Sequence, residues 1–260
     1  MIGDLAGFVA ATYMRGIPVV LIPTTLLAMI DASIGGKTAV DTPAGKNLVG
    51  TFHPPAGVIV EPQVLDSLPL TELRAGFAEA IKHGVIADEP YLLDVASALP
   101  ELLANGGTKS DRMDSLIVRS IEIKADVVSR DEREEGLRKI LNFGHTIGHA
   151  IELISGYSLL HGQAVAIGMA IESRIAEEIG VAQSGTAATV MKTLELAGLP
   201  TRLPPGSGID AVIGAMKSDK KARSGRIQLS LPERIGAMAG EKAGWTVQVT
   251  DDQLREVLAQ

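Results

Sequence analysis

Cysteine is absent from this sequence, so it can form neither disulfide bonds nor thiolate-bound metal sites. Any tightly held zinc must therefore be bound by His, Asp or Glu side chains. Long apolar runs are also missing. The best candidate, residues 18–30, is too short to cross a bilayer and is broken by a proline and two threonines. We expect no membrane partner, and the lack of disulfides agrees with a reducing, cytoplasmic compartment.

Basic residues are too few to give a positive field. The 260 residues include 24 Lys and Arg against 31 Asp and Glu, for a net charge of −7. Because binding to nucleic acid needs a basic surface, we expect no nucleic-acid partner, although a locally basic pocket remains compatible with this charge. Hydrophobic residues make up 46% of the chain, enough for a sizeable core.

The hydrophobic pattern divides the chain into two regions. Residues 4–15 have helical spacing, 17–23 and 57–61 are short apolar runs typical of buried parallel strands, and 36–52 predicts a hairpin. After residue 68 most segments have a period of 3.6 residues, with short β-like stretches at 226–231 and 244–249. The predicted helices are 71–87, 90–104, 109–129, 146–156, 160–180, 184–197, 208–217 and 251–259. We predict an α/β region over 1–68 followed by a mainly helical domain over 69–260.

The predicted sheet has few strands. Two strands and a hairpin cannot bury a sheet face well, and the first helix has no strand before it. Either the sheet is very small, or residues upstream are missing.

Three of the five histidines cluster in the second region. His145 and His149 are four residues apart and share one helix face, and His161 follows at the start of the next helical segment. Zinc bound without cysteine needs such ligands and an open position for substrate. A zinc peptidase is excluded because Thr146 stands where its general base belongs. Structural histidines are the alternative, but a cluster of three beside Asn142 favours a metal or catalytic site.

Glu79 lies inside an apolar helical segment. A buried carboxylate is costly unless it is paired or bound to a metal. Lys82, one turn further on, could be its ion-pair partner, so this segment alone leaves a structural pair and a metal ligand equally open.

The remaining polar motifs are weak when taken singly. Lys37, Lys46 and Asn47 lie on the predicted hairpin, where they suit anion binding, although a solvated hairpin is the commoner explanation. Lys124 and Arg138 flank the run 131–135, and another charged run is 219–221. Runs of this kind are usually solvated.

Together, several segments resemble the 3-dehydroquinate synthase family in order and spacing across nearly the whole chain. They are GDLAGF (3–8), PTTLLA (23–28), DASIGGKTAVDTPAGKNLVG (31–50), FAEAIKHG (77–84), DEREEGLR (131–138), LNFGHTIGHA (141–150) and HG (161–162). The resemblance implies a partial Rossmann-like NAD-binding domain followed by a mainly helical domain that binds metal and substrate.

The resemblance also implies roles for particular residues. Zn²⁺ (or Co²⁺) would be bound by Glu79, His145 and His161. The residues implied in catalysis are His149, Lys82, Asn142, Arg138 and Lys124. Those implied in substrate binding are Arg15, Asp31, Lys37, Asn47 and Lys221 (or Lys220). Those implied in NAD binding are Gly3, Asp4, Thr24, Thr25, Lys37, Lys46, Asp66 and Ser67.

The implied activity is that of a lyase of the shikimate pathway, in aromatic amino acid biosynthesis. It converts 3-deoxy-D-arabino-heptulosonate 7-phosphate to 3-dehydroquinate and phosphate by transient NAD oxidation, phosphate elimination and intramolecular aldol closure. The two anionic ends of this sugar-acid phosphate require Lys and Arg side chains. A cytoplasmic homodimer is the expected form.

One departure from the family pattern lies at the start of the chain. The family has a Gly-rich turn before GDLAGF, of which Ile2, Gly3 and Asp4 remain behind Met1. Such glycines bring the backbone close to pyrophosphate, so we expect weak NAD binding. We expect Met1 to be an internal methionine taken as a start. The alternatives are a related sugar-phosphate cyclase, a metal-dependent polyol dehydrogenase and a non-catalytic metal-binding remnant.

Overall fold

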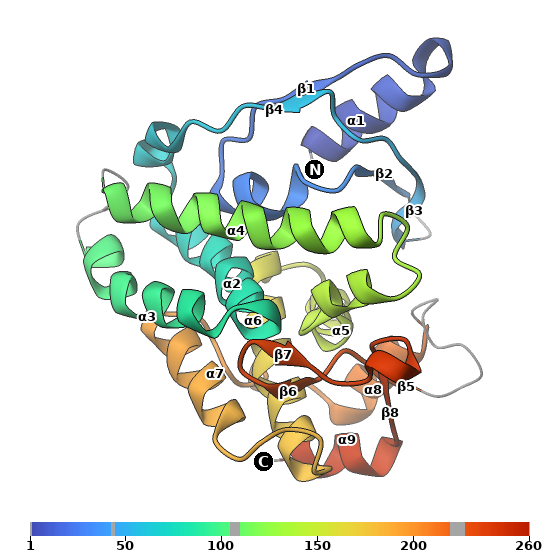
Figure 1. Ribbon diagram of the computed structural model, residues 1–260. Helices are drawn as coiled ribbons and strands as arrows, with labels where there is room; N and C mark the ends of the chain where they lie inside the picture. The colour runs from blue at the N-terminus through green and yellow to red at the C-terminus, as the bar shows by residue number, and fades with distance from the viewer. Residues whose placement is uncertain (1, 43–44, 105–109, 219–226, 260) are drawn as a thin grey trace.

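The computed structural model describes residues 2–42, 45–104, 110–218 and 227–259. Figure 1 shows two layers: the N-terminal helix and strands lie at one end of the molecule, and the helices α2 to α9 form the other. This arrangement confirms the predicted fold class, an α/β part followed by a mainly helical part. The division after residue 68 stays a prediction, although α2 begins two residues later, at Leu70.

The N-terminal layer is built from short elements. They are α1 (Ile2–Thr12), η1 (Tyr13–Arg15), β1 (Val20–Leu21), the π-helical turn η2 (Ala28–Ala32), β2 (Lys37–Thr42), β3 (Gly45–Phe52), β4 (Gly57–Val58) and η3 (Pro62–Ser67). Strands β2 and β3 pair antiparallel, with Lys37 opposite Phe52, which confirms the predicted hairpin.

The expectation of buried strands at 17–23 and 57–61 is wrong. Strands β1 and β4 pair in parallel for two residues each, and Val20 and Ile59 are 54% and 56% exposed. Among the described residues no third strand joins this pair. A parallel strand is buried only when neighbours and helices cover both faces, so apolar composition alone did not determine burial here. The sheet that the described residues form here is therefore very small.

The second layer consists of eight helices, two small strand pairs and two short 3₁₀ turns, in the part of the chain that the structure describes. The helices are α2 (Leu70–Ala87), α3 (Glu89–Ala104), α4 (Asp111–Arg130), α5 (His145–Ile154), α6 (His161–Glu178), α7 (Thr186–Leu196), α8 (Ile209–Ser218) and α9 (Asp251–Leu258). The turns are η4 (Leu137–Asn142) and η6 (Glu241–Ala243). Strand β5 (Ile227–Leu229) pairs with β8 (Val247–Val249), and β6 (Pro232–Arg234) pairs with β7 (Ala237–Met238). The eight predicted helices are confirmed to within two residues at every end, whereas β6 and β7 were not predicted.

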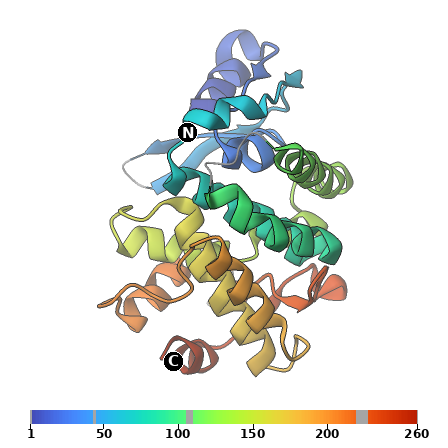
Figure 2. The same ribbon diagram turned by 90° about the vertical axis from the view of Figure 1, so that its left-hand side faces the viewer.

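Helix α2 is the centre of this layer. Every residue from Ala75 to Ile86 is buried, because α3, α4, α6 and α7 surround it. A helix that is apolar on all sides is typical of such a central position. The turned view in Figure 2 shows the helices stacked beneath the N-terminal layer. The polar side chains in this buried stretch, Glu79, Lys82 and His83, are therefore held inside the protein.

No helix among the described residues is long and apolar enough to cross a membrane.

Candidate active site

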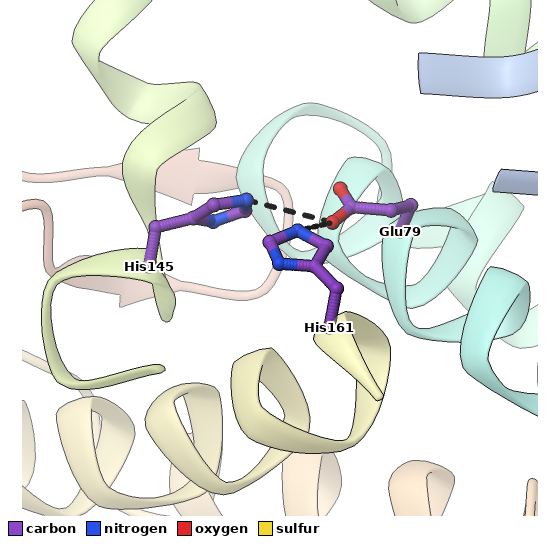
Figure 3. Close-up of side chains that lie close together, drawn as sticks. All are labelled: Glu79, His145 and His161. Carbon is purple, nitrogen blue, oxygen red and sulfur yellow. Dashed lines mark ion pairs between the residues drawn. The ribbon is translucent and has the colours of Figure 1, made fainter. Parts of the chain in front are cut away.

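Three side chains from three helices point toward one another (Figure 3). Glu79 comes from the middle of α2, and His145 and His161 are the first residues of α5 and α6. The Nε2 atoms of His145 and His161 lie 3.5 Å and 3.6 Å from Oε1 of Glu79. One ligand atom from each side chain lies within 4.8 Å of the other two, which is close enough to share one metal ion. The fold thus brings together all three residues that the family resemblance implied as metal ligands.

The Glu79 carboxylate is fully buried, and neither of its oxygens has a hydrogen-bond partner among the described residues. Burial alone would raise its pKa, but the ammonium of Lys82, which forms an ion pair with Oε2, and the neighbouring histidines hold the pKa well below its usual range. Only Oε2 has a charged partner, whereas Oε1 faces the two imidazoles, so this buried, ionised carboxylate can accept further cationic charge at Oε1. One carboxylate and two imidazoles are a donor set that zinc and cobalt accept, so these residues fit a divalent metal ion.

The second nitrogen of each histidine also has a partner. Nδ1 of His145 lies 3.1 Å from the carbonyl oxygen of Phe143, and Nδ1 of His161 lies 3.5 Å from Oε2 of Glu152. Burial lowers the pKa of His145 well below its usual value. Burial acts in the same direction on His161, but the carboxylates of Glu152 and Glu79 outweigh it and raise its pKa to about 9.

Close packing of α5 on α6 fixes the position of His145. Gly144, with φ +78°, precedes α5, and a Cβ added at Gly168 of α6 would overlap its carbonyl oxygen. The buried carboxylate of Glu172 accepts a hydrogen bond of 2.8 Å from the N–H of Gly144. A carboxylate at a helix N-terminus satisfies N–H groups that have no partner within the helix and interacts favourably with its dipole.

A second cluster surrounds Asp31, which lies on the π-helical turn η2. Its Oδ1 is 2.7 Å from Nζ of Lys124, 3.5 Å from Nζ of Lys82 and 3.7 Å from Nε2 of His83. Burial alone would raise the pKa of Asp31, but the two lysines and His83 hold it well below its ordinary value. His83 is itself buried and bonds through Nδ1 to Oγ of Ser120 at 2.7 Å. Lys82 therefore links the Asp31 cluster to Glu79.

Two other cations implied for the substrate, Arg138 and Lys37, have partners within the protein. Arg138 is 1% exposed, and its guanidinium donates to the backbone carbonyls of Gly35 and Glu132. The carboxylate of Glu134 accepts a hydrogen bond from Asn142 and forms an ion pair with Lys37. Glu134 thus connects the hairpin to the turn that precedes α5.

His149 lies one helical turn beyond His145 on α5, and its side chain is exposed. Its ring centroid is 5.4 Å from that of His145 and 5.9 Å from that of His161. It is therefore at the solvent side of the three-histidine cluster.

A cavity of about 560 Å³ lies between α1, β1 and β2. Five of the residues implied in NAD binding line it: Gly3, Asp4, Thr24, Thr25 and Lys37. The cavity also reaches Ala32 and Ser33, which directly follow Asp31. It therefore extends from α1 to the edge of the Asp31 cluster.

The remaining implied residues lie elsewhere. Asp66, Ser67, Arg15 and Asn47 are exposed and do not line this cavity. The side chain of Lys46 and all of Lys221 lie outside the described residues.

Sequence reasoning gave no role to Glu152, His83 or Glu134. Glu152 had a recognisable signal, because it is seven residues after His145 and so shares its helix face with both His145 and His149. His83 and Glu134 had no such signal. Ser120 lies 37 residues from His83, and Lys37 is on the hairpin, far from Glu134 in the sequence.

Comparison with known proteins identifies the family. The model of the 3-dehydroquinate synthase N-terminal domain matches residues 1–75, and that of the C-terminal domain matches residues 76–222. A protein of Nostoc punctiforme named 3-dehydroquinate synthase is 48% identical over 261 residues, which cover 99% of this chain and 70% of that protein. A protein of the same name from Symbiobacterium thermophilum is 50% identical over 237 residues, covering 91% of this chain and 65% of that one.

Solved structures agree with this result. The 2-epi-5-epi-valiolone synthase of Streptomyces hygroscopicus, solved with NAD⁺ and Zn²⁺, superposes with a TM-score of 0.88 at 30% identity, covering 98% of this chain and 69% of that one. A 2-deoxy-scyllo-inosose synthase with carbaglucose-6-phosphate, NAD⁺ and Co²⁺ gives 0.86 at 28% identity, covering 98% and 70%. A probable glycerol dehydrogenase of Sinorhizobium meliloti, 16% identical with a TM-score of 0.61, shares the fold alone. With both domain models matched in order, and with relatives of that name 48–50% identical, the chain belongs to the 3-dehydroquinate synthase family.

Proposed function

We propose that this protein converts 3-deoxy-D-arabino-heptulosonate 7-phosphate to 3-dehydroquinate and phosphate. The observation that carries the proposal is the meeting of Glu79, His145 and His161 at one point, with Lys82 paired to Oε2 of Glu79 and Lys124 paired to the neighbouring Asp31. A metal site beside buried ammonium groups suits a polyhydroxylated, anionic substrate.

In this proposal Glu79, His145 and His161 hold one Zn²⁺ or Co²⁺. When bound, the metal supplies Lewis-acid polarisation and a template for the substrate hydroxyls. The protein's own part is to aim three donors at one point from three helices and to exclude water around Glu79. The valiolone and inosose synthases, solved with Zn²⁺ and Co²⁺, support this proposal through their shared fold.

We further propose that NAD lies in the cavity between α1, β1 and β2, against Gly3, Asp4, Thr24, Thr25 and Lys37. When bound, NAD supplies reversible hydride transfer and is not consumed. The first turn of α1 lines this cavity, and a helix N-terminus favours a phosphate group. The cavity reaches Ala32 and Ser33, which directly follow Asp31, so cofactor and substrate would meet at the Asp31 cluster.

The proposed catalytic residues are Lys82, Lys124, Arg138, Asn142 and His149. The proposed substrate-binding residues are Arg15, Asp31, Lys37, Asn47 and Lys221. The charges of Lys82 and Lys124 are balanced mainly by Asp31 and Glu79 inside the protein. The guanidinium of Arg138, by contrast, donates to the neutral backbone carbonyls of Gly35 and Glu132, and its Nε has no hydrogen-bond partner among the described residues, so it could donate to a substrate anion. The substrate phosphate would help to remove its own proton, because His149 is exposed rather than enclosed. Complete loss of phosphate elimination in His149→Ala would instead make His149 the base.

The test is a reaction of the purified protein with the sugar-acid phosphate, catalytic NAD and Zn²⁺. We expect stoichiometric phosphate and dehydroquinate without net NADH. The control substrate is a seven-carbon sugar phosphate that lacks the carboxylate. Turnover of that analogue alone would identify a different cyclase, and net NADH would indicate a polyol dehydrogenase. Zinc binding without NAD binding would favour a non-catalytic remnant.

We also propose a homodimer that works in the cytoplasm, with a domain boundary after residue 68. Both the oligomeric state and the compartment follow from the family resemblance. Light scattering on the purified protein would test the first, because a mass near 27.2 kDa, that of one chain, would contradict it.

A further inference from the structure

The two nitrogens of the His161 ring face two different carboxylates. Nε2 is 3.6 Å from Oε1 of Glu79, and Nδ1 is 3.5 Å from Oε2 of Glu152. Glu152 is 4% exposed and lies in the last turn of α5, whereas His161 is the first residue of α6. The contact therefore crosses from the end of one helix to the beginning of the next.

His145 has the same arrangement with a different acceptor. Its Nε2 is 3.5 Å from Oε1 of Glu79, and its Nδ1 is 3.1 Å from the carbonyl oxygen of Phe143. A carbonyl oxygen can only accept, so the proton of the neutral ring must be on Nδ1, and Nε2 has a free lone pair. With a metal on Nε2 of His161, the one remaining ring proton would be on Nδ1, where the carboxylate of Glu152 can accept it. Both rings thus present Nε2 to the same point beside Glu79.

We propose that Glu152 is the positioning residue of His161, holding its ring with Nε2 aimed at Glu79 and so setting the affinity of the site for a divalent metal. The inference rests on the proposed function, because it assumes that Glu79, His145 and His161 bind the metal. Histidine ligands generally donate their second N–H to an oxygen acceptor, and loss of that acceptor weakens metal binding by about 10–100-fold.

A competing arrangement would make Glu152 itself a ligand. One donor atom each from His149, Glu152 and His161 also lie within 4.8 Å of one another. However, Glu152 faces Nδ1 of His161, while Nε2 of the same ring faces Glu79. A metal beside Glu79 would bind Nε2 of His161. The ring proton would then be on Nδ1, so Nδ1 could not bind a second ion beside Glu152. The geometry favours a single ion with Glu152 as hydrogen-bond acceptor.

The experiment compares Glu152→Ala and Glu152→Gln with the unchanged chain. Zn²⁺ affinity is measured by competition with a chromophoric chelator, together with the number of ions bound. For Glu152→Ala we expect affinity about 10–100-fold weaker with one ion still bound. Glu152→Gln keeps an oxygen that accepts from Nδ1–H, so its affinity should lie between the two.

The Nδ1–H proton of His161 gives a readout that a purely structural role would not change. In ¹H–¹⁵N spectra of the zinc-bound unchanged chain, we expect His161 as the Nδ1–H form, with this proton shifted downfield and slow to exchange because Glu152 accepts from it. In zinc-bound Glu152→Ala the same proton should shift upfield and exchange faster with water. The matched control is Glu177→Gln, also on α6, whose Oε1 accepts 2.8 Å from the N–H of Ala187, far from the cluster in sequence. It should bind zinc as the unchanged chain does.

The outcomes separate the inference from the proposed function. If the unchanged chain binds one zinc ion and Glu152→Ala binds it equally well, the inference is wrong and the proposed metal site stands. Loss of one of two bound ions in Glu152→Ala would make Glu152 a ligand and also overturn it. If the unchanged chain binds no zinc, both proposals fail. Urea unfolding of the metal-free variants checks that each is folded before these comparisons are made.

Discussion

The carboxylate of Glu172, in the middle of α6, accepts a hydrogen bond of 2.8 Å from the backbone N–H of Gly144, the residue that precedes α5. Oε1 of the same side chain is 3.4 Å from the N–H of Ile147. A fully buried glutamate on one helix therefore caps the helix that begins with His145. This cap joins the start of α5, which carries His145, to α6, which carries His161.

Removing this cap should destabilise the protein. Glu172→Ala leaves the N–H of Gly144 buried without this acceptor, at a cost of about 1–3 kcal/mol in the free energy of unfolding. Glu172→Gln keeps one oxygen acceptor and should lose less. Urea unfolding measures both, with Glu256→Gln on the exposed face of α9 as the control expected to be within about 0.5 kcal/mol of the unchanged chain. Equal stability of Glu172→Ala would contradict the capping role.

Gly168 should not tolerate a methyl group. A Cβ at this position would overlap the carbonyl oxygen of Gly144, so Gly168→Ala must push α5 away from α6. We expect a loss of about 1–3 kcal/mol in stability, the usual cost of overpacking, together with weaker zinc binding. Gly214→Ala in α8 is the matched control, because nothing lies within 4 Å of its added Cβ. That variant should gain up to about 1 kcal/mol from helix propensity. Similar stabilities for the two variants would argue against close contact between α5 and α6.

Lys82 should behave as the charge partner of two buried carboxylates. Lys82→Met removes the ammonium that pairs with Glu79 and Asp31, leaving buried negative charge at a cost of about 3–5 kcal/mol without metal. A divalent cation beside Glu79 replaces part of the missing charge. Zinc should therefore raise the melting temperature of Lys82→Met more than that of the unchanged chain. An equal rise in thermal melting scans would show that the lysine and the metal do not share the Glu79 charge.

Stability should fall on acidification because His83 is buried. Burial is the main cause that lowers the pKa of His83 from its ordinary value of about 6.5. The unfolded chain then binds a proton near pH 6.5 that the folded chain does not, so the free energy of unfolding decreases as pH falls from there toward the lowered pKa. Each unmatched proton contributes up to about 1.4 kcal/mol per pH unit.

Urea unfolding in chelator from pH 7 to pH 5 tests this pH dependence. His83→Gln should show a shallower dependence than the unchanged chain, because glutamine does not bind the proton. His53→Gln changes the same residue type in the N-terminal layer and serves as the control. A slope unaltered by His83→Gln would mean that this histidine does not contribute to the acid destabilisation.

The sequence by itself determined most of the helical layer and the identity of its polar residues. A period of 3.6 residues depends on local geometry, so α2 to α9 follow from spacing alone. The histidine pair on one face of α5 follows from the same rule. Motif order was specific enough to indicate the family, because several short segments matched jointly over nearly the whole chain.

The tertiary structure decided what those residues touch. The apolar runs around Val20 and Ile59 were predicted to be buried, yet they are largely exposed, because burial depends on neighbouring strands that no local pattern supplies. Likewise, the sequence left Glu79 between an ion pair and a metal ligand. The fold pairs Lys82 with one of its oxygens and brings two imidazoles to the other. Local spacing could not show this, because His145 and His161 lie more than 60 positions beyond Glu79 in the sequence.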